Sequence, residues 1–178
     1  RYSSGPFMAN GVVVASMSGC NAAQPGGCFI TGHDPKTGAE KWRVHTVAQD
    51  GDPNAKTWNG LPLSERFGGS AWIAGSYDPE TDTIYHGVGQ PYPWIAEMRG
   101  TTPKKDGFDN SALYTDATLA IDPKSGKMKW HFQHLENDTL DLDYAYERIL
   151  VDLPIAGKTR KAVVTAGKLA IVEVLDRT

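Results

Sequence analysis

The chain has 178 residues, of which 40% are hydrophobic and 10% aromatic, with 19 glycines, 11 prolines and a formal net charge of −3. No apolar run approaches the roughly 18 residues that a membrane-spanning helix needs, and no basic cluster offers a footprint for phosphates. These features favour an all-β protein that neither binds nucleic acid nor inserts into a membrane.

The first local feature along the chain is a pair of cysteines, Cys20 and Cys28, which enclose the segment from Asn21 to Gly27. Their spacing matches neither a redox pair nor a site of covalent haem attachment. We expect a local disulfide, which indicates an oxidising compartment. Two free thiols are the alternative.

Three Asp-Pro turns follow at equal spacing, with Asp34, Asp78 and Asp122 each 44 residues from the next. Asp caps such a turn with its side chain, and Pro presets the next backbone angle. Gly38 and Gly126 supply the left-handed residue that closes the first and third turns. Asp82 takes this place in the second.

Each turn lies between two strand-like runs, so the sequence predicts a repeated strand, hairpin, strand unit. Before the turns these runs are 28–31, 71–76 and 117–121, and after them 41–44, 83–86 and 128–132. Such a repeat is typical of a β-propeller blade. A looser fourth copy ends the chain at Val174–Thr178. We expect about four blades, within a single β-propeller domain that covers residues 1–178 and is truncated at both ends. The remainder of the propeller would then complete the ring.

Several segments resemble the quinoprotein alcohol dehydrogenases, periplasmic eight-bladed propellers that bind pyrroloquinoline quinone (PQQ) on their central axis. The resemblance covers nearly the whole chain. The most specific segments are 18–21, 27–31, 68–72, 75–79, 85–94, 110–115, 140–143 and 174–178.

The resemblance implies different roles for three of the tryptophans. Trp42 and Trp130 each follow the Asp of a turn by eight residues, where the family places a tryptophan that docks onto the next blade. Trp72 precedes its turn, on an expected inner strand, where the family's tryptophan forms the floor on which the quinone stacks. A core position between blades is the alternative for Trp72.

The resemblance also implies the other contacts of PQQ. Ser18, Gly19 and Cys20 match a loop that holds the PQQ carboxylates, and an ordinary turn at the end of a strand is the alternative. Ser70 matches a hydroxyl-bearing position at the cofactor edge. Lys168 matches the cation that polarises the reactive quinone carbonyl, with a solvated surface lysine as the alternative.

Catalysis and metal binding would centre on Asp141. In the family this Asp accepts the proton of the alcohol while hydride passes to the quinone. Asp143 lies two residues further on, and in an extended strand it would point to the same side as Asp141. With Asn21 and Gln90 the two carboxylates would supply oxygen ligands to one cation.

Three positions depart from the pattern of the family. Asn21 replaces a Glu metal ligand, Gln90 replaces an Asn, and Leu140 replaces the tryptophan before the catalytic Asp. An acidic residue at the position of Asp143 is a feature of the lanthanide-using members, whereas the loss of the Glu argues for a lower charge on the metal. Calcium and a lanthanide ion both stay open, with calcium favoured because it is more prevalent.

The function that the resemblance implies is oxidation of an alcohol by PQQ, with electrons passed to a cytochrome c. Leu140 and Gln90 suggest a larger or more polar alcohol than methanol or ethanol. A non-catalytic propeller scaffold is the first alternative. A glycosidase that pairs Asp141 with Glu147 is the second, but it leaves Trp72 and Lys168 unexplained.

Overall fold

A computed structural model describes residues 3–21 and 23–178 of the chain. The strands are β1 (Phe7–Ala9), β2 (Val12–Ser16), β3 (Phe29–His33), β4 (Glu40–His45), β5 (Phe67–Gly68), β6 (Ser76–Asp78), β7 (Thr83–Gly87), β8 (Pro91–Tyr92), β9 (Ala117–Ile121), β10 (Met128–Gln133), β11 (Ile149–Ile155), β12 (Lys158–Ala166) and β13 (Val172–Asp176). The helices are short: η1 (Pro53–Trp58), η2 (Leu63–Glu65) and α1 (Ala96–Arg99). In the described part of the chain, no helix is long and apolar enough to span a membrane.

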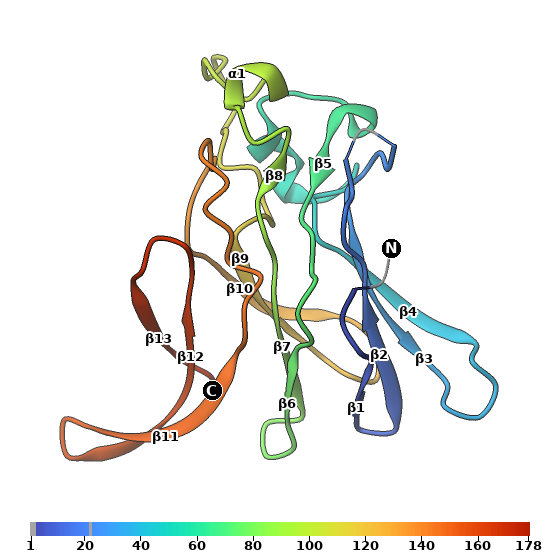
Figure 1. The fold of residues 1–178 in the computed structure, drawn as a ribbon, viewed down its shortest axis with the longest axis vertical. Coiled ribbons are helices and arrows are strands. Elements are labelled where there is room, and N and C mark those ends of the chain that lie inside the picture. Colours follow the sequence, from blue (N-terminus) through green and yellow to red (C-terminus); the bar gives the residue numbers. More distant parts are fainter. Residues whose placement is uncertain (1–2, 22) are drawn as a thin grey trace.

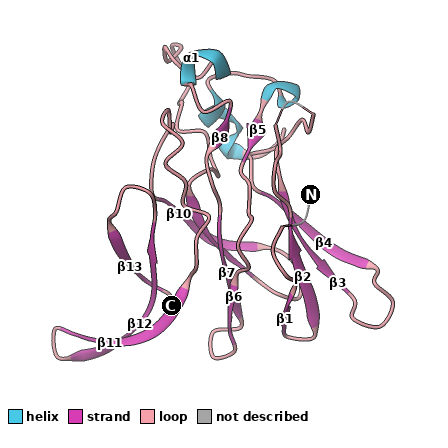
Figure 2. Cartoon of the chain, viewed as in Figure 1, coloured by secondary structure: helices cyan, strands magenta, loops and turns pink. Residues whose placement is uncertain are grey.

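The strands form antiparallel meanders that stand side by side like open propeller blades (Figure 1). The first sheet has the order β1-β2-β3-β4, the second β6-β7-β9-β10 and the third β11-β12-β13, while β5 pairs only with β8. The predicted all-β architecture is confirmed. The helices and the β5-β8 pair gather at one end of the sheets, the upper end in Figure 2.

The Asp-Pro turns have the predicted chemistry. Asp34 Oδ1 accepts the backbone N–H groups of Lys36 and Thr37 at 2.9 and 3.0 Å. Asp122 does the same in the β9-β10 hairpin, where Oδ1 accepts two backbone N–H groups at 3.0 and 2.8 Å. Gly38, Gly126 and Asp82 all have positive φ, at 74°, 71° and 47°.

The equal spacing of the turns does not correspond to one blade per turn. The turn at Asp78 joins β6 to β7, and the turn at Asp122 joins β9 to β10, so both lie in the second sheet. Long connections before β6 and between β7 and β9 stretch this sheet over two turn intervals. The described residues therefore form two four-stranded sheets, one three-stranded sheet and the two-stranded β5-β8 pair.

The first two sheets pack through Trp42, as the resemblance implied. The Trp42 side chain is 7% exposed, and its Nε1–H donates to the Pro123 carbonyl in the turn of the second sheet at 2.8 Å. The indole packs against Gly32 on its own sheet and Gly126 on the neighbouring one, and a Cβ at Gly126 would lie 2.8 Å from Trp42. Trp42 therefore docks one blade onto the next.

Trp130 lies between the second and third sheets. Its ring centroid is 5.7 Å from that of Tyr85, and both pack with Val163 of the third sheet. The predicted inter-blade position is confirmed.

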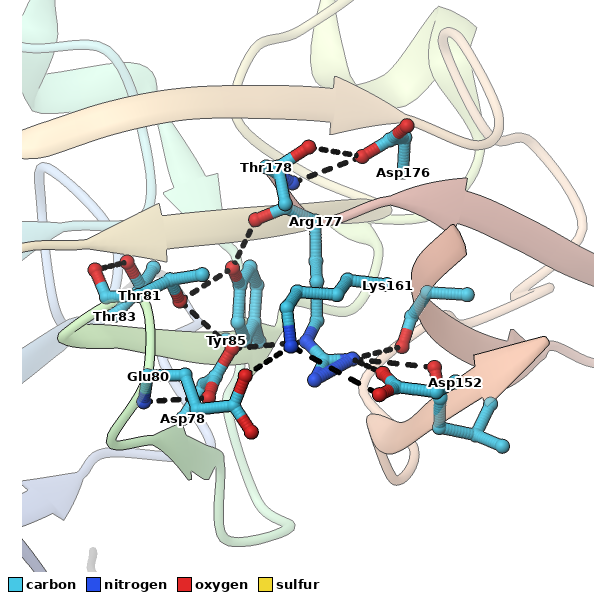
Figure 3. A network of polar contacts seen from close by, with 12 residues as sticks. Asp78, Glu80, Thr81, Thr83, Tyr85, Asp152, Lys161, Asp176, Arg177 and Thr178 are labelled. Atoms are coloured by element: carbon cyan, nitrogen blue, oxygen red, sulfur yellow. Dashed lines mark hydrogen bonds and ion pairs between the residues drawn. The ribbon is translucent and has the colours of Figure 1, made fainter. Parts of the chain in front are cut away.

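A polar network supports the same interface (Figure 3). Arg177 donates from Nε to Asp78 at 2.9 Å and from Nη1 to Asp152 at 3.1 Å. The Tyr85 hydroxyl donates to the Arg177 carbonyl at 2.6 Å, and Lys161 pairs with Glu80. Arg177 and Asp78 are both nearly buried, with side chains 6% and 3% exposed. A buried pair of this kind needs good hydrogen-bond geometry to offset its desolvation, and here each partner has several further contacts.

Candidate active site

A small cavity lies at the end of the sheets where β5 pairs with β8. Its volume is about 160 Å³, and it is lined by Gly19, Cys20, Asn21, Gly68, Ser70, Gln90 and Tyr92. The close approach of these segments depends on Gly68, which has φ of 98°. A Cβ there would lie 2.6 Å from the Gln90 carbonyl oxygen. Because only glycine leaves this space free, Gly68 allows β5 to lie against both cavity walls.

One wall of the cavity is held by a disulfide. Cys20 and Cys28 are bonded, with Cα atoms 5.3 Å apart, so the predicted disulfide is confirmed and the free-thiol alternative is wrong. Gly68 N–H donates to the Cys20 carbonyl at 2.7 Å, and Cys28 N–H donates to the Gly68 carbonyl at 2.9 Å. Both ends of the disulfide loop are thus tied to the same residue of β5.

Two of the predicted PQQ-binding residues meet directly. The Gly19 N–H donates to Ser70 Oγ at 3.0 Å, and Gly19 has φ of 75°. Ser18 lies one residue before this contact, and its hydroxyl accepts a hydrogen bond from Ser3 at 2.9 Å. Gly19, Cys20 and Ser70 therefore line one cavity, with Ser18 directly beside it.

Trp72 is not among the residues that line this cavity and lies next to Gly89 and Tyr146. It belongs to the connection between β5 and β6, so the expectation that it lies on a strand is wrong. A Cβ at Gly89 would come within 2.8 Å of the Trp72 ring, and the Tyr146 ring meets it edge-on, with centroids 6.2 Å apart. Trp72 is partly exposed, so the protein does not enclose it completely.

Asp141, Asp143 and Lys168 form one charged cluster. The Lys168 ammonium lies 2.5 Å from Asp143 Oδ2 and 3.1 Å from Asp141 Oδ2. Asp143 Oδ1 accepts the backbone N–H of Gln90 at 3.2 Å. The cluster is therefore connected to the wall of the cavity through Gln90.

The extended strand expected for Asp141 and Asp143 is absent. Asp141 has a left-handed backbone with φ of 62°, and residues 139–145 are an irregular loop. The two carboxylates converge because both contact Lys168, and alternation along a strand plays no part.

Burial and charge shift the pKa values in this cluster. Burial raises the pKa of Asp143, while the hydrogen bond from Lys168 acts in the opposite direction. Burial lowers the pKa of Lys168, but hydrogen bonds and charge interactions with Asp143 and Asp141 outweigh it and raise this pKa above its ordinary value. Lys168 is therefore a permanent cation at neutral pH.

The four predicted metal ligands fall into two groups. Asn21 and Gln90 line the cavity, whereas Asp141 and Asp143 contact Lys168. The Gln90 Oε1 atom is buried and has no hydrogen-bond partner among the described residues, which suits an oxygen that accepts from a ligand or cation. Residues 3–21 and 23–178 contain no group of three or more His, Cys, Asp or Glu side chains that could hold a metal. Any metal here would thus depend on amide oxygens as well as carboxylates.

Sequence reasoning missed two buried acids beside the cluster. Asp138 is 2% exposed and Asp116 is fully buried. Burial, followed by the charges of Asp138 and Asp143, raises the pKa of Asp116 well above its usual range. The only signal for Asp138 in the sequence is an Asp ahead of a loop, where Asp often accepts backbone N–H groups further along the chain. Asp116 gave no such signal.

The geometry of this site can be set beside that of known proteins. The whole chain, residues 1–178, matches the PQQ family described as the glucose/ethanol/alcohol dehydrogenase β-propeller domain. The chain belongs to this family.

Individual family members show the extent of the similarity. A quinohemoprotein alcohol dehydrogenase of Comamonas testosteroni is 36% identical over 97% of this chain and 25% of its own length. The quinoprotein alcohol dehydrogenase PedH of Pseudomonas putida is 32% identical over 99% of the chain and 30% of its own length. This PQQ-family chain thus spans about a quarter to a third of the curated relatives it matches.

Solved structures of the family agree with the fold. The crystal structure of the Comamonas testosteroni enzyme superposes with a TM-score of 0.84 at 33% identity, over 98% of this chain and 27% of the other. A europium-containing methanol dehydrogenase superposes with a TM-score of 0.80 at 26% identity, over 97% of this chain and 31% of the other. The open sheets described above are thus consistent with part of a family propeller.

Proposed function

We propose that the protein containing this chain is a PQQ-dependent alcohol dehydrogenase. The observation that carries the proposal is the Lys168 ammonium, which bridges Asp141 and Asp143 next to Gln90 of the cavity wall. Gly89 lies between Asp143 and Trp72, which supports a carboxylate and its bound cation near the proposed stacking surface. A scaffold has no need for this arrangement.

The residues present fit PQQ. Trp72 would provide the surface for stacking, and Gly19, Cys20 and Ser70 would contact the edge of the cofactor, with Ser18 beside them. When bound, PQQ would accept the hydride from the alcohol carbon, and this hydride carries both electrons of the oxidation. Asp141 would take the hydroxyl proton onto its carboxylate, and Lys168, as a point charge, would stabilise the negative charge that develops on the acceptor.

We further propose that Asn21, Gln90, Asp141 and Asp143 hold a Ca²⁺ or lanthanide ion, which would lower the pKa of the alcohol. The buried, unpartnered Gln90 Oε1 supports this assignment. Electrons would pass to a cytochrome c in the periplasm, a setting that agrees with the Cys20–Cys28 disulfide.

The test uses the full-length protein reconstituted with PQQ and metal. We expect Asp141→Asn to lower kcat for alcohols by about 10² to 10⁴ while PQQ still binds, because the amide keeps the size of the side chain but cannot accept the proton. Glu40→Gln, on an exposed stretch of β4, removes the same charge and should leave kcat unchanged. Full activity of Asp141→Asn would refute the proposed mechanism.

The metal assignment has its own test. Asp143→Ala should weaken metal affinity more for a trivalent lanthanide than for Ca²⁺, because the Coulomb interaction scales with the charge of the ion. Titration of the metal into the PQQ-loaded protein measures both affinities. Equal affinity in the variant and the wild type, for both ions, would exclude Asp143 as a ligand.

A further inference from the structure

Asp138 has a buried carboxylate that binds the backbone on both sides of Asp141. It lies in the loop between β10 and β11 and is 2% exposed. Its Oδ1 accepts the N–H of Leu140 at 2.8 Å, and its Oδ2 accepts the N–H of Leu142 at 2.6 Å. One side chain therefore holds the residues immediately before and after Asp141.

These two hydrogen bonds act beside a left-handed residue. Asp141 has φ of 62°, a conformation that is uncommon for residues other than glycine, although Asp adopts it more readily than most. Packing contributes little here, since Leu140 is 72% exposed. The two hydrogen bonds to Asp138 therefore support this backbone conformation from the residues on either side of Asp141.

Arg99 holds Asp138 in place. Arg99 is 4% exposed, and its Nη2 donates to the Asp138 carbonyl at 3.0 Å and to Asn137 Oδ1 at 2.7 Å. Its Nη1 donates to the carbonyls of Pro93 and Trp94, beyond β8. Asp138 is thus fixed to the segment that follows the cavity wall.

We propose that Asp138 is a positioning residue that sets the backbone of Asp141, so that the Asp141 carboxylate stays beside Lys168. The inference rests on the proposed function, in which Asp141 accepts the proton of the alcohol. Lys168 completes the arrangement by donating to the Asp141 carbonyl at 2.8 Å. Among the described residues, the Asp138 carboxylate accepts hydrogen bonds only from the backbone N–H groups of Leu140 and Leu142, so its effect on catalysis would pass through Asp141.

The first test is a double-mutant cycle in the full-length, PQQ-loaded enzyme. Asp138→Asn replaces one acceptor oxygen with an NH₂ group that cannot accept a backbone N–H. We expect kcat to fall about 10- to 100-fold with KM little changed, the range expected for a shift of about 1 Å in a reacting group. In an Asp141→Asn background, Asp138→Asn should cause no further fall, because residues that act through one another are not additive.

The matched control is Asp122→Asn, which removes the same kind of carboxylate cap from the β9-β10 turn. It should lower the thermal midpoint as Asp138→Asn does but leave kcat unchanged. Hydrogen exchange of the peptide 138–143, measured without cofactor, gives a readout independent of turnover. Exchange there should be faster in Asp138→Asn and unchanged in Asp122→Asn.

The outcomes separate the two proposals. Unchanged kcat or unchanged exchange in Asp138→Asn, with Asp141→Asn inactive, would overturn the positioning role alone. A fall in kcat that is the same in both backgrounds would also overturn it. Full activity of Asp141→Asn would overturn the proposed function and, with it, the positioning role of Asp138 in catalysis.

Discussion

Trp42 and Trp72 are the same type of residue in two regions of this molecule, and their surroundings differ. Trp42 is 7% exposed, with its N–H bonded to Pro123 in the neighbouring sheet. Trp72 is partly exposed and lies in an irregular connection, separated from Asp143 by Gly89. The protein buries Trp42 almost completely, whereas it leaves Trp72 partly exposed.

Both tryptophans depend on glycines, but with different consequences. Gly126 has φ of 71° and lies under the Trp42 ring in the turn of the second sheet. Gly89 lies between Trp72 and Asp143. The absence of a side chain at Gly126 therefore allows the blades to pack. The absence of a side chain at Gly89 allows Trp72 and Asp143 to approach each other.

The largest effect should come from filling these two spaces in the full-length protein. Gly126→Ala adds a Cβ at 2.8 Å from Trp42 and strains a left-handed residue, so we expect a loss of about 2 to 4 kcal/mol in unfolding free energy. Denaturant titration measures it. A loss below about 0.5 kcal/mol would show that the Trp42 packing is loose.

Gly89→Ala is the corresponding substitution next to Trp72. Its Cβ would lie 2.6 Å from Asp143 Oδ1 and 2.8 Å from Trp72, so it should displace both and weaken PQQ binding about 10-fold or more, as expected for about 1.4 kcal/mol. Equilibrium titration with PQQ measures the affinity. Unchanged PQQ affinity in a folded Gly89→Ala protein would contradict the role of Trp72 as the stacking surface.

The next effect concerns the Cys20–Cys28 disulfide beside the cavity. Replacing both Cys20 and Cys28 with Ser opens a short loop, which should cost about 2 to 3 kcal/mol of stability in the chain-entropy model. Because Cys20 lines the cavity, PQQ affinity should fall as well. Thermal unfolding and PQQ titration measure the two effects, and a loss of stability with unchanged affinity would separate the loop from the cofactor site.

Sequence reasoning predicted the regular parts of this fold better than the site. The strands around Asp34 and Asp122 and the left-handed Gly38 and Gly126 follow from local turn chemistry, which acts over a few residues. The grouping of turns into sheets did not follow, because the pairing of β7 with β9 skips a long connection that local patterns do not reveal.

The site shows the same division. Asp141, Asp143 and Lys168 could be singled out from the resemblance, and the structure brings them together. The left-handed backbone of Asp141 and the support from Asp138 could not be predicted. They depend on hydrogen bonds within an irregular loop, for which neither periodicity nor propensity gives a signal.

A smaller effect should appear in the pH dependence of the packing between the first two sheets. His86 on β7 is fully buried, and burial lowers its pKa to about 4, while its ring lies 6.4 Å from that of Phe7 on β1. Between pH 6.5 and 4 the unfolded chain binds a proton that the folded protein excludes, so stability should fall as the pH falls through this window.

The expected loss attributable to His86 is about 1 to 3 kcal/mol. His86→Gln removes the ionisable group and should flatten the decline in unfolding free energy between pH 6.5 and 4. Unfolding free energies of the cofactor-free protein across this range measure the difference. Parallel curves for the variant and the wild type would show that His86 does not titrate in this window.

The smallest effects are those that test the difference between the two tryptophans directly. Trp42→Phe keeps an aromatic ring but loses the 2.8 Å hydrogen bond to the Pro123 carbonyl, and a buried unpaired carbonyl costs about 1 to 3 kcal/mol. Because the turn can relax and expose the Pro123 carbonyl to water, we expect a loss of stability of about 1 kcal/mol, at the lower end of this range. PQQ affinity should not change, because Trp42 is buried between the first two sheets.

Trp72→Phe should give the opposite result. No hydrogen bond from its indole to a neighbouring residue is lost in the described part of the chain, and the ring is already partly exposed, so the unfolding free energy should change by less than about 0.5 kcal/mol. The smaller ring offers less surface to a flat cofactor, so PQQ affinity should fall. If Trp42→Phe lowered PQQ affinity, or Trp72→Phe lowered stability alone, the division between a docking tryptophan and a cofactor-facing tryptophan would be wrong.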